Sequence, residues 1–315
     1  MTERTSDSNT AALDSESGPE SLDSELSTWR ERQLDAWRRR IAFLKGEPMG
    51  LAGILIMLAI ILVAIFAPMI APYEPTETDY GNSLAPPSAE HPLGTDSAGR
   101  DIFSQLVFGA RPALQIGLLS AVSVAFVGMN VGLIAGYYGG YVDDALMRLV
   151  DFAYGIPFTP FIIVLVALWE PSKWTIVAAI ALLLWRQTAR VVRSHVLNLK
   201  EKPFVKSART VGASDRRIIY RHIAPNVLPL VFLYGSFAIA WAILTEASIS
   251  YLGFGDPTAV TWGQMLQSAQ QSQALARDAW WWFTMPGMAI MLTVISAFLI
   301  GRGYEEQLNP ELQQE

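Results

Sequence analysis

Three arginines share one face of a long apolar segment, where charge is costly and therefore points to pairing or to function. Arg186, Arg190 and Arg193 are spaced i, i+4 and i+7 within the stretch 174–193. Charges inside such segments usually face the helix bundle or a watery path. Arg186 and Arg190 are therefore candidates for a translocation path or a gate. The alternative is that these side chains extend to the headgroups at one membrane surface.

A single carboxylate lies deep in another apolar segment. Glu246 is 19 residues into the stretch 227–250, or about 29 Å along a helix that rises 1.5 Å per residue. It is thus expected near the far membrane boundary, either in an outer gate or in a structural pair. Arg148 and Asp151, three residues apart, are expected to pair on one helix face.

Several kinds of chemistry are excluded by the sequence. It contains no cysteine, so disulfides and thiolate metal sites are absent. His91, His195 and His222 are scattered, without the spacing of a zinc-protease motif. A phosphate-binding loop of the form G-x-x-x-x-G-K-[ST] is also missing. The chain is therefore not expected to hydrolyse ATP in the P-loop manner, nor to hold a cofactor or a metal.

The apolar residues form blocks that are long enough to cross a membrane. The composition is 51% hydrophobic and 17% charged, and residues 51–67 carry no charge. A span of hydrocarbon about 30 Å thick needs roughly 20 such residues. These blocks predict an all-α membrane protein with six transmembrane helices, near residues 49–71, 113–136, 149–169, 174–193, 227–250 and 280–300.

The ends of the chain differ in charge. Residues 1–28 carry seven acidic side chains and are expected to be a disordered cytoplasmic tail. Residues 29–48 space aromatic and aliphatic side chains among arginines, which favours an amphipathic helix on the membrane surface, with a plain basic flank as the alternative. Residues 304–315 are expected to be a second cytoplasmic tail. The acidic excess with only five lysines is typical of halophilic organisms, although an ordinary acidic tail explains it equally well.

Basic residues predict the topology, because they resist translocation. The loop from Arg186 to Arg221 carries ten of them against two acids, which indicates the cytoplasm. Residues 72–112 are acidic and turn-rich and are expected outside, as are residues 251–279. Six spans then place both termini in the cytoplasm, in a cell membrane. Trp169, Trp174 and the run 280–282 fall at the expected outer boundaries, where indoles favour the headgroup region.

A polar, basic segment at residues 203–229 interrupts the apolar pattern. Pro203 suits the first turn of a helix, and Gly212 suits its end. Ser214 is a good N-cap for a second helix that runs from Asp215 to residue 223, and Pro225 is expected to stop it. We call residues 203–225 the basic hairpin. From its residues alone it is either a structured loop or a surface for a partner.

The basic hairpin resembles the EAA loop of ABC-transporter permeases. Lys206, Ser207 and Ala208 stand at the Glu-Ala-Ala positions, and Lys206 and Ser207 depart from that pattern. Gly212 and Pro225 match its glycine and its terminal proline. The resemblance assigns ATPase coupling to Lys206, Ser207, Ala208, Gly212, Ala213, Ser214, Asp215, Arg216 and Pro225.

Further segments resemble the C-type subunit of the dipeptide/oligopeptide/nickel branch. They are HPLGTDSAGRDIFSQLVFGAR (91–111), MRLVDFAYGIP (147–157), EASISYLGFG (246–255), TWGQML (261–266) and PGMAIMLTVISAFLIG (286–301). The resemblance covers about residues 40–310, in the family's order. The stretch 301–310 exchanges acid and base at two positions of the family pattern, so contacts made by that tail cannot be transferred.

The resemblance implies a type I ABC importer permease fold with a cytoplasmic coupling-helix loop at 194–226 inside a core that spans 113–303. It implies a transport subunit rather than an enzyme, importing dipeptides or oligopeptides and forming half of the pathway. The implied partners are a homologous B-type permease, two ATPases that bind ATP and Mg²⁺, an extracellular substrate-binding protein and membrane lipid, with no nucleic acid.

Two other function classes remain open from the sequence. An ion-coupled secondary transporter would need carboxylates or histidines near the membrane centre or paired inverted repeats, and only the peripheral Glu246 is present. A membrane scaffold would use the basic hairpin as an adaptor site. The glycines 128, 132 and 136 predict a close helix contact, either with a second permease or within this chain.

Overall fold

The computed structural model describes residues 48–308. The expected acidic tail (1–28), the expected interfacial helix except for residue 48, and residues 309–315 lie outside the described residues. Within residues 48–308 all regular elements are helical, apart from one isolated bridge between Thr95 and Asp101. The all-α prediction is therefore confirmed for this part of the chain.

Five of the described helices are long and apolar enough to cross a membrane. They are α2 (Pro48–Ile65), α4 (Ile102–Tyr138), α7 (Lys173–Leu199), α10 (Ala224–Tyr251) and α12 (Trp280–Leu308). Shorter helices connect them: α3 (Ala67–Ile70), η1 (Tyr80–Asn82), α5 (Gly140–Gly155), α6 (Phe158–Leu168), α8 (Pro203–Thr210), α9 (Asp215–Arg217), the π-helical η2 (Ile218–Ile223), α11 (Trp262–Gln271) and η3 (Ala274–Arg277).

The span expected at residues 149–169 is not one straight helix. Its residues are divided between α5 and α6, whose axes differ by 87°. Proline disfavours helical backbone in the residue before it, and Ile156, which precedes Pro157, is extended at φ −82° and ψ 124°. Six spans are thus present only if this bent pair counts as one.

The span expected at residues 113–136 is longer than predicted. Its helix, α4, starts eleven residues earlier and continues through Pro112. In membrane helices a proline is tolerated when neighbouring groups satisfy the freed backbone atoms. The helix begins instead at Ile102, directly after its N-cap Asp101, whose carboxylate accepts a 2.7 Å hydrogen bond from the Ser104 amide. An N-cap of this kind satisfies one of the first free amides. The preceding loop therefore ends at residue 101 rather than at 112.

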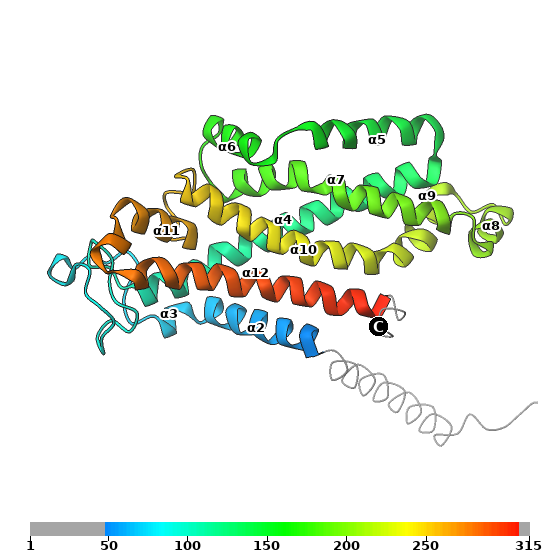
Figure 1. Ribbon diagram of the computed structural model, residues 1–315. Coiled ribbons are helices and arrows are strands. Elements are labelled where there is room, and N and C mark those ends of the chain that lie inside the picture. Colours follow the sequence, from blue (N-terminus) through cyan, green and yellow to red (C-terminus); the bar gives the residue numbers. More distant parts are fainter. Residues whose placement is uncertain (1–47, 309–315) are drawn as a thin grey trace, which may run out of the picture. The chain divides into compact units, whose positions relative to one another are not determined.

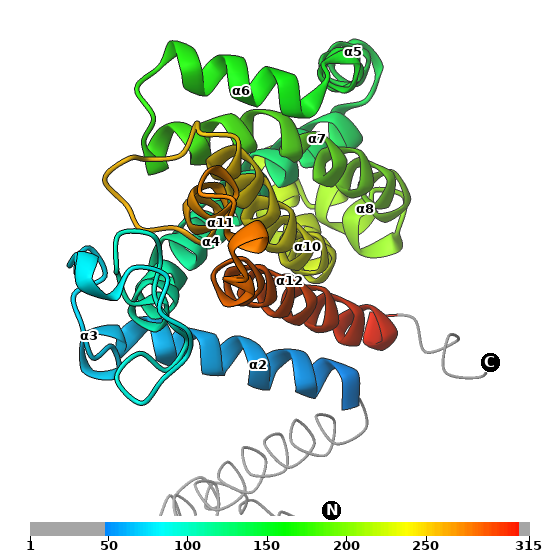
Figure 2. The same cartoon turned by 60° about the vertical axis from the view of Figure 1, so that its left-hand side comes forward.

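The helices form a layered bundle (Figures 1 and 2). The pair α2 and α12 lies on one side, α4 and α10 lie in the middle, and α7 separates them from α5 and α6. The helices α8 and α9 mark one end of the bundle, which we call the hairpin end. The loop 71–101, α3 and α11 gather at the opposite end, the loop end. The first residues of α2 and the last residues of α12 both lie at the hairpin end.

Close packing between α4 and α7 explains the spaced glycines. A Cβ atom on Gly132 would lie 2.6 Å from the Ala189 carbonyl oxygen, and one on Gly136 would lie 2.7 Å from the Val196 Cβ. Small residues allow two backbones to approach this closely. Of the two alternatives left open by the sequence, the glycine steps serve a contact within this chain.

The tryptophans at the loop end divide into two groups. Trp169, Trp174 and Trp280 are half or more exposed, as expected for headgroup anchors. Trp281 and Trp282 are instead buried in a cluster with α11. Successive residues of a helix point in directions about 100° apart, so a run of three indoles cannot face lipid together. The prediction that the run 280–282 lies in the headgroup region is thus wrong for Trp281 and Trp282.

Candidate functional site

The basic hairpin folds as two helical segments around a glycine turn. Pro203 stands in the first turn of α8, and Gly212 has φ +79°, which L side chains rarely adopt. Ser214 occupies the N-cap position of α9, but its hydroxyl makes no capping hydrogen bond. Asp215 follows in the first turn, where a negative charge favours the helix dipole. The expected helix, turn and second helix are all present.

Pro225 does not stop the second helix, contrary to prediction. Residues Asp215–Tyr251 run on as one candidate span through η2 into α10. In η2 the register widens by one residue, so that the Ala224 amide bonds the Ile219 carbonyl. Pro225 then stands in the first turn of α10, where a missing amide hydrogen is harmless. The Asn226 side-chain amide donates to the His222 carbonyl at 2.6 Å.

The inner face of the hairpin is anchored in the bundle. Val205 from α8 and Ile218 and Ile223 from η2 are completely buried. They pack with Leu133 of α4 and Val196 of α7 in one hydrophobic cluster. Burying an aliphatic side chain of this size contributes about 1.5–3 kcal/mol. The hairpin is thus held as a single body with the ends of α4, α7 and α10.

Polar contacts join the hairpin and the end of α7 to the last turn of α4. The Tyr137 hydroxyl donates to Asp215 Oδ1 at 2.6 Å, and Lys200 Nζ donates to the Gly136 carbonyl at 2.9 Å. The guanidinium of Arg209 lies 5.6 Å from the centre of the Tyr137 ring. Hydrogen bonding to Tyr137 raises the pKa of Arg209 above its ordinary value. Sequence reasoning missed Tyr137, although an aromatic pair before Gly139 could have indicated it.

The outer face of the hairpin remains uncovered within the described chain. Val211 at the turn is 83% exposed and Phe204 is 42% exposed. Lys206 pairs with Glu201 at 3.1 Å on this surface, with both side chains mostly exposed. The candidate residues are exposed except Ala208 and Ala213, which pack against the buried cluster. An apolar tip with a charged surround is suited to a protein partner.

The three arginines of α7 contact α5, while a role of Arg186 and Arg190 in a translocation path or gate stays a prediction. The Arg186 guanidinium donates to the Ala153 carbonyl at 2.9 Å, and Arg190 pairs with Asp151 at 2.7 Å. Arg193 makes two bonds to the Asp143 carboxylate, one of them at 2.6 Å. The Arg186 and Arg190 guanidinium groups also lie over the Tyr154 ring, at 4.6 and 4.4 Å.

One ion pair predicted from the sequence is wrong. Asp151 was expected to bond Arg148 on its own helix, but it bonds Arg190 on α7. A pair between helices is favoured here because the face of α7 that carries the arginines lies along α5. The basic face predicted from i, i+4 and i+7 is therefore real, and its partners are the acids and carbonyls of α5.

Glu246 is buried at the loop end of α10. It is 1% exposed, and its Oε1 accepts a 2.7 Å hydrogen bond from the Ser250 hydroxyl. The residue lines a cavity of about 450 Å³, together with Arg111, Lys173 and Asp256. Its carboxylate is buried and does not lie on the outer surface of the bundle. A role in gating stays a prediction.

Comparison with known proteins adds to this geometry. Residues 128–309 match the family described as "binding-protein-dependent transport system inner membrane component". Residues 34–87 match a second family, the "N-terminal TM domain of oligopeptide transport permease C". The first match includes α5 to α12 and hence the whole basic hairpin.

Three relatives align over most of their length. The dipeptide transport system permease protein DppC of Alkalihalophilus pseudofirmus is 36% identical over 89% of this chain and 91% of the relative. The oligopeptide transport system permease protein OppC of Bacillus subtilis is 34% identical over 90% and 92%. The glutathione transport system permease protein GsiD of Pectobacterium atrosepticum is 36% identical, also over 90% and 92%.

Proposed function

This chain belongs to the family of binding-protein-dependent transport system inner membrane components, and we propose that its basic hairpin couples it to the ATPase of the transporter. The chain is a permease subunit of an ABC importer and is not itself an enzyme. The observation that carries the proposal is the pairing of a buried inner face with an exposed apolar tip at Val211.

The proposal sets the orientation of the bundle. The hairpin end carries Arg209, Arg216, Arg217 and Arg221, and basic residues resist translocation. We place this end in the cytoplasm and the loop end outside. The described ends of α2 and α12 share the hairpin end, which supports cytoplasmic termini.

The proposed partners are based on the family and on the lack of a phosphate-binding loop in this sequence. Importers of this family work with an ATPase and a binding protein. We propose two ATPase subunits that hold ATP and Mg²⁺, an external binding protein, and a homologous B-type permease that forms the other half of the pathway. We place the nucleotide on the ATPase subunits, a proposal supported by the lack of a phosphate-binding loop in this sequence.

The coupling step is a movement of the hairpin as one body. When the two ATPases close on ATP, each ATPase moves, and a hairpin seated in its groove moves with that ATPase. Val205, Ile218 and Ile223 transmit the displacement to α7 and α10, because they are completely buried in one cluster with residues of these helices. The bond from Tyr137 to Asp215 carries it to α4. The glycines at 139 and 140, with φ of +68° and +52°, form the joint at which α5 begins.

Movement at that joint reaches the membrane interior through α5. The Arg193–Asp143 pair obliges α5 to follow α7, and the 87° bend leads directly into α6. Interfaces of this kind switch between two packings rather than deform continuously. We propose that α5 and α6 move together during gating, with Arg186 and Arg190 fixing α5 to α7.

The substrate class is a short peptide. The three relatives are named for dipeptides, oligopeptides and glutathione, which are all short peptides. We extend this class to the present chain.

Uptake driven by ATP tests the function. The chain is reconstituted in vesicles with its partner permease, ATPases and binding protein, and accumulation of a labelled dipeptide is measured. We expect accumulation with enclosed ATP and none with a non-hydrolysable analogue. Accumulation driven by a proton or sodium gradient without ATP would instead favour a secondary transporter that uses Glu246.

A further inference from the structure

A buried carboxylate without a cationic partner faces a cavity at the loop end. Glu246 is 1% exposed, and the hydroxyls of Ser250 and Thr261 are its hydrogen-bond donors. Within residues 48–308 it forms no ion pair. Burying a charge without a partner of opposite sign is costly, and an ionisable residue inside a membrane bundle therefore points to a function. The cavity of about 450 Å³ beside it has the volume of a small-molecule site.

Two cationic side chains line the same cavity from other helices. Arg111 of α4 donates to the carbonyls of Ala64 and Ile65 at 2.6 and 3.1 Å. A guanidinium has five N–H donors, so these two bonds leave donors for a ligand. Lys173, the first residue of α7, donates from Nζ to Gln115 Oε1 at 3.3 Å. This bond is long and its acceptor is neutral, so the ammonium group lacks a countercharge there. The cavity therefore presents both signs of charge.

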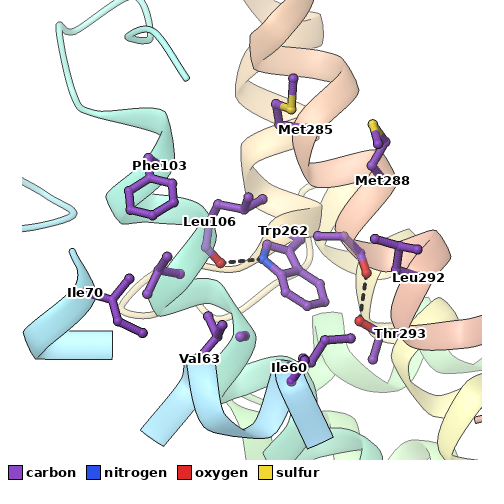
Figure 3. A pocket seen from close by; sticks show the side chains of 14 residues that line it. Ile60, Val63, Ile70, Phe103, Leu106, Trp262, Met285, Met288, Leu292 and Thr293 are labelled. Carbon is purple, nitrogen blue, oxygen red and sulfur yellow. Dashed lines mark hydrogen bonds between the residues drawn. The ribbon is translucent and has the colours of Figure 1, made fainter. Parts of the chain in front are cut away.

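The wall that carries Thr261 is fixed to the bundle. Thr261 caps α11 and accepts a hydrogen bond from the Gln264 amide at 3.3 Å. The next residue, Trp262, is 3% exposed, and its indole N–H donates to the Leu106 carbonyl of α4 at 2.8 Å (Figure 3). The side-chain amide of Gln264 donates to the Asp256 carbonyl at 2.5 Å. The site is thus held in place by backbone contacts, as is usual for small-molecule sites.

The charges of the cavity select the chemistry of its ligand. Arg111 and Lys173 would repel a metal ion, and a simple anion would be repelled by Glu246. A second carboxylate, Asp256, also lines the cavity, but its Oδ1 already accepts from the amide and the hydroxyl of Thr258 at 2.9 and 2.6 Å. A zwitterion meets opposite charge at both of its ends and forms charge-assisted hydrogen bonds with each. The cavity therefore suits a small zwitterion.

We propose that this cavity binds a short peptide by both of its free ends, with the ammonium group at Glu246 and the carboxylate group at Lys173 and Arg111. The inference rests on the proposed function, which makes short peptides the substrate and places the loop end outside. A peptide released by the external binding protein meets this site before it enters the bundle. Peptides with a blocked end lose one of the two charge contacts and are bound less tightly.

Titration of the intact transporter with small peptides tests the site. The purified transporter, without its binding protein and without ATP, is titrated calorimetrically with dialanine, with N-acetyl-dialanine and with dialanine amide. The second ligand lacks the ammonium group and the third lacks the carboxylate. We expect dialanine to bind at least about tenfold more tightly than either blocked form, because each has lost a hydrogen-bonded charge contact. Equal affinities for the three ligands, or no binding of dialanine at millimolar concentration, would overturn the proposal.

Variants assign the two ends of the peptide. Glu246→Gln keeps the shape of the side chain and an acceptor for Ser250, but it removes the charge. It should abolish the preference for dialanine over N-acetyl-dialanine. Lys173→Gln should instead reduce the preference for dialanine over dialanine amide. Glu170→Gln, an exposed position in the loop before α7, is the matched control and should keep both preferences. A full preference for dialanine in Glu246→Gln, with normal thermal unfolding, would show that Glu246 does not bind the ammonium group.

The titration and the uptake experiment fail independently. A transporter that accumulates dialanine with ATP, but binds the three ligands equally, disproves the peptide site and leaves the proposed function intact. A transporter that accumulates no peptide with ATP disproves the proposed function. In that case the titration still decides whether the cavity binds a zwitterion, because binding is measured without ATP and without the binding protein.

Discussion

The substitution Val211→Asp is expected to separate the permease from its ATPase without unfolding it. Val211 is 83% exposed and belongs to no buried cluster, so the change leaves the fold intact. If the tip docks in a groove of the ATPase, the substitution removes buried aliphatic surface and places a carboxylate against an apolar wall. This change is expected to cost about 2–4 kcal/mol of binding free energy. Association should weaken roughly 30- to 1,000-fold. Co-purification of the ATPase and ATP-driven uptake measure this loss.

Neighbouring substitutions are less informative than the one at Val211. Ala208 packs against the buried cluster, so a charge there would disturb the hairpin itself. Any side chain at Gly212 must adopt a φ of +79°, which adds backbone strain. Val211→Thr keeps the shape of valine and is the matched control, for which most of the uptake should persist. Normal ATPase association by Val211→Asp would show that the tip does not dock.

The second large effect is expected at the ion pair between α7 and α5. The change Arg193→Met leaves Asp143, which is 8% exposed, without its partner. Breaking a fully buried pair costs about 3–5 kcal/mol, and we expect about 2–4 kcal/mol here because the Arg193 side chain is 31% exposed. The temperature of unfolding in detergent should fall, and uptake should fall further than ATP hydrolysis as α5 loses its link to α7.

A neighbouring pair supplies the control for that prediction. Arg190 and Asp151 also join α7 to α5, but through a single hydrogen bond at 2.7 Å, and their side chains are 50% and 69% exposed. Exposed pairs contribute about 0–1 kcal/mol, so Arg190→Met should be nearly neutral for stability. The double change Arg193→Met with Asp143→Leu should recover most of the lost stability, since no charge stays buried alone. Equal effects of the two single changes would refute this account of α5.

Much of the fold could be predicted from local sequence. Apolar length identified the straight spans, since a segment such as α2 has no other stable environment. The basic hairpin was also readable, because Pro203 and Gly212 act through backbone conformation alone. The start of α4 was not predicted from local sequence. It lies eleven residues before the predicted start, because the Asp101 carboxylate caps the helix by accepting a hydrogen bond from the Ser104 amide.

The features that escaped prediction depend on contacts distant in sequence. Pro225 stops a helix in isolation, but the widened register of η2 lets this helix continue. The glycines of α4 signalled a close contact, but only the fold shows that α7 is the partner. Two basic residues were possible partners for Asp151: Arg148 on its own helix and Arg190 on α7. Only the packing of α7 against α5 shows that Arg190 is the partner. Tyr137 was missed because its partner Asp215 lies 78 residues away.

Contact between the hairpin tip and the ATPase is the most direct test of the central claim. The sequence contains no cysteine, so Val211→Cys can carry a single photoactivatable benzophenone in this chain. Met69→Cys, 82% exposed at the loop end, is the matched control. Irradiation of the assembled transporter should crosslink the variant at Val211 to the ATPase and should leave the variant at Met69 free of it. A transporting complex with no ATPase adduct at Val211, or with one at Met69, would contradict the account.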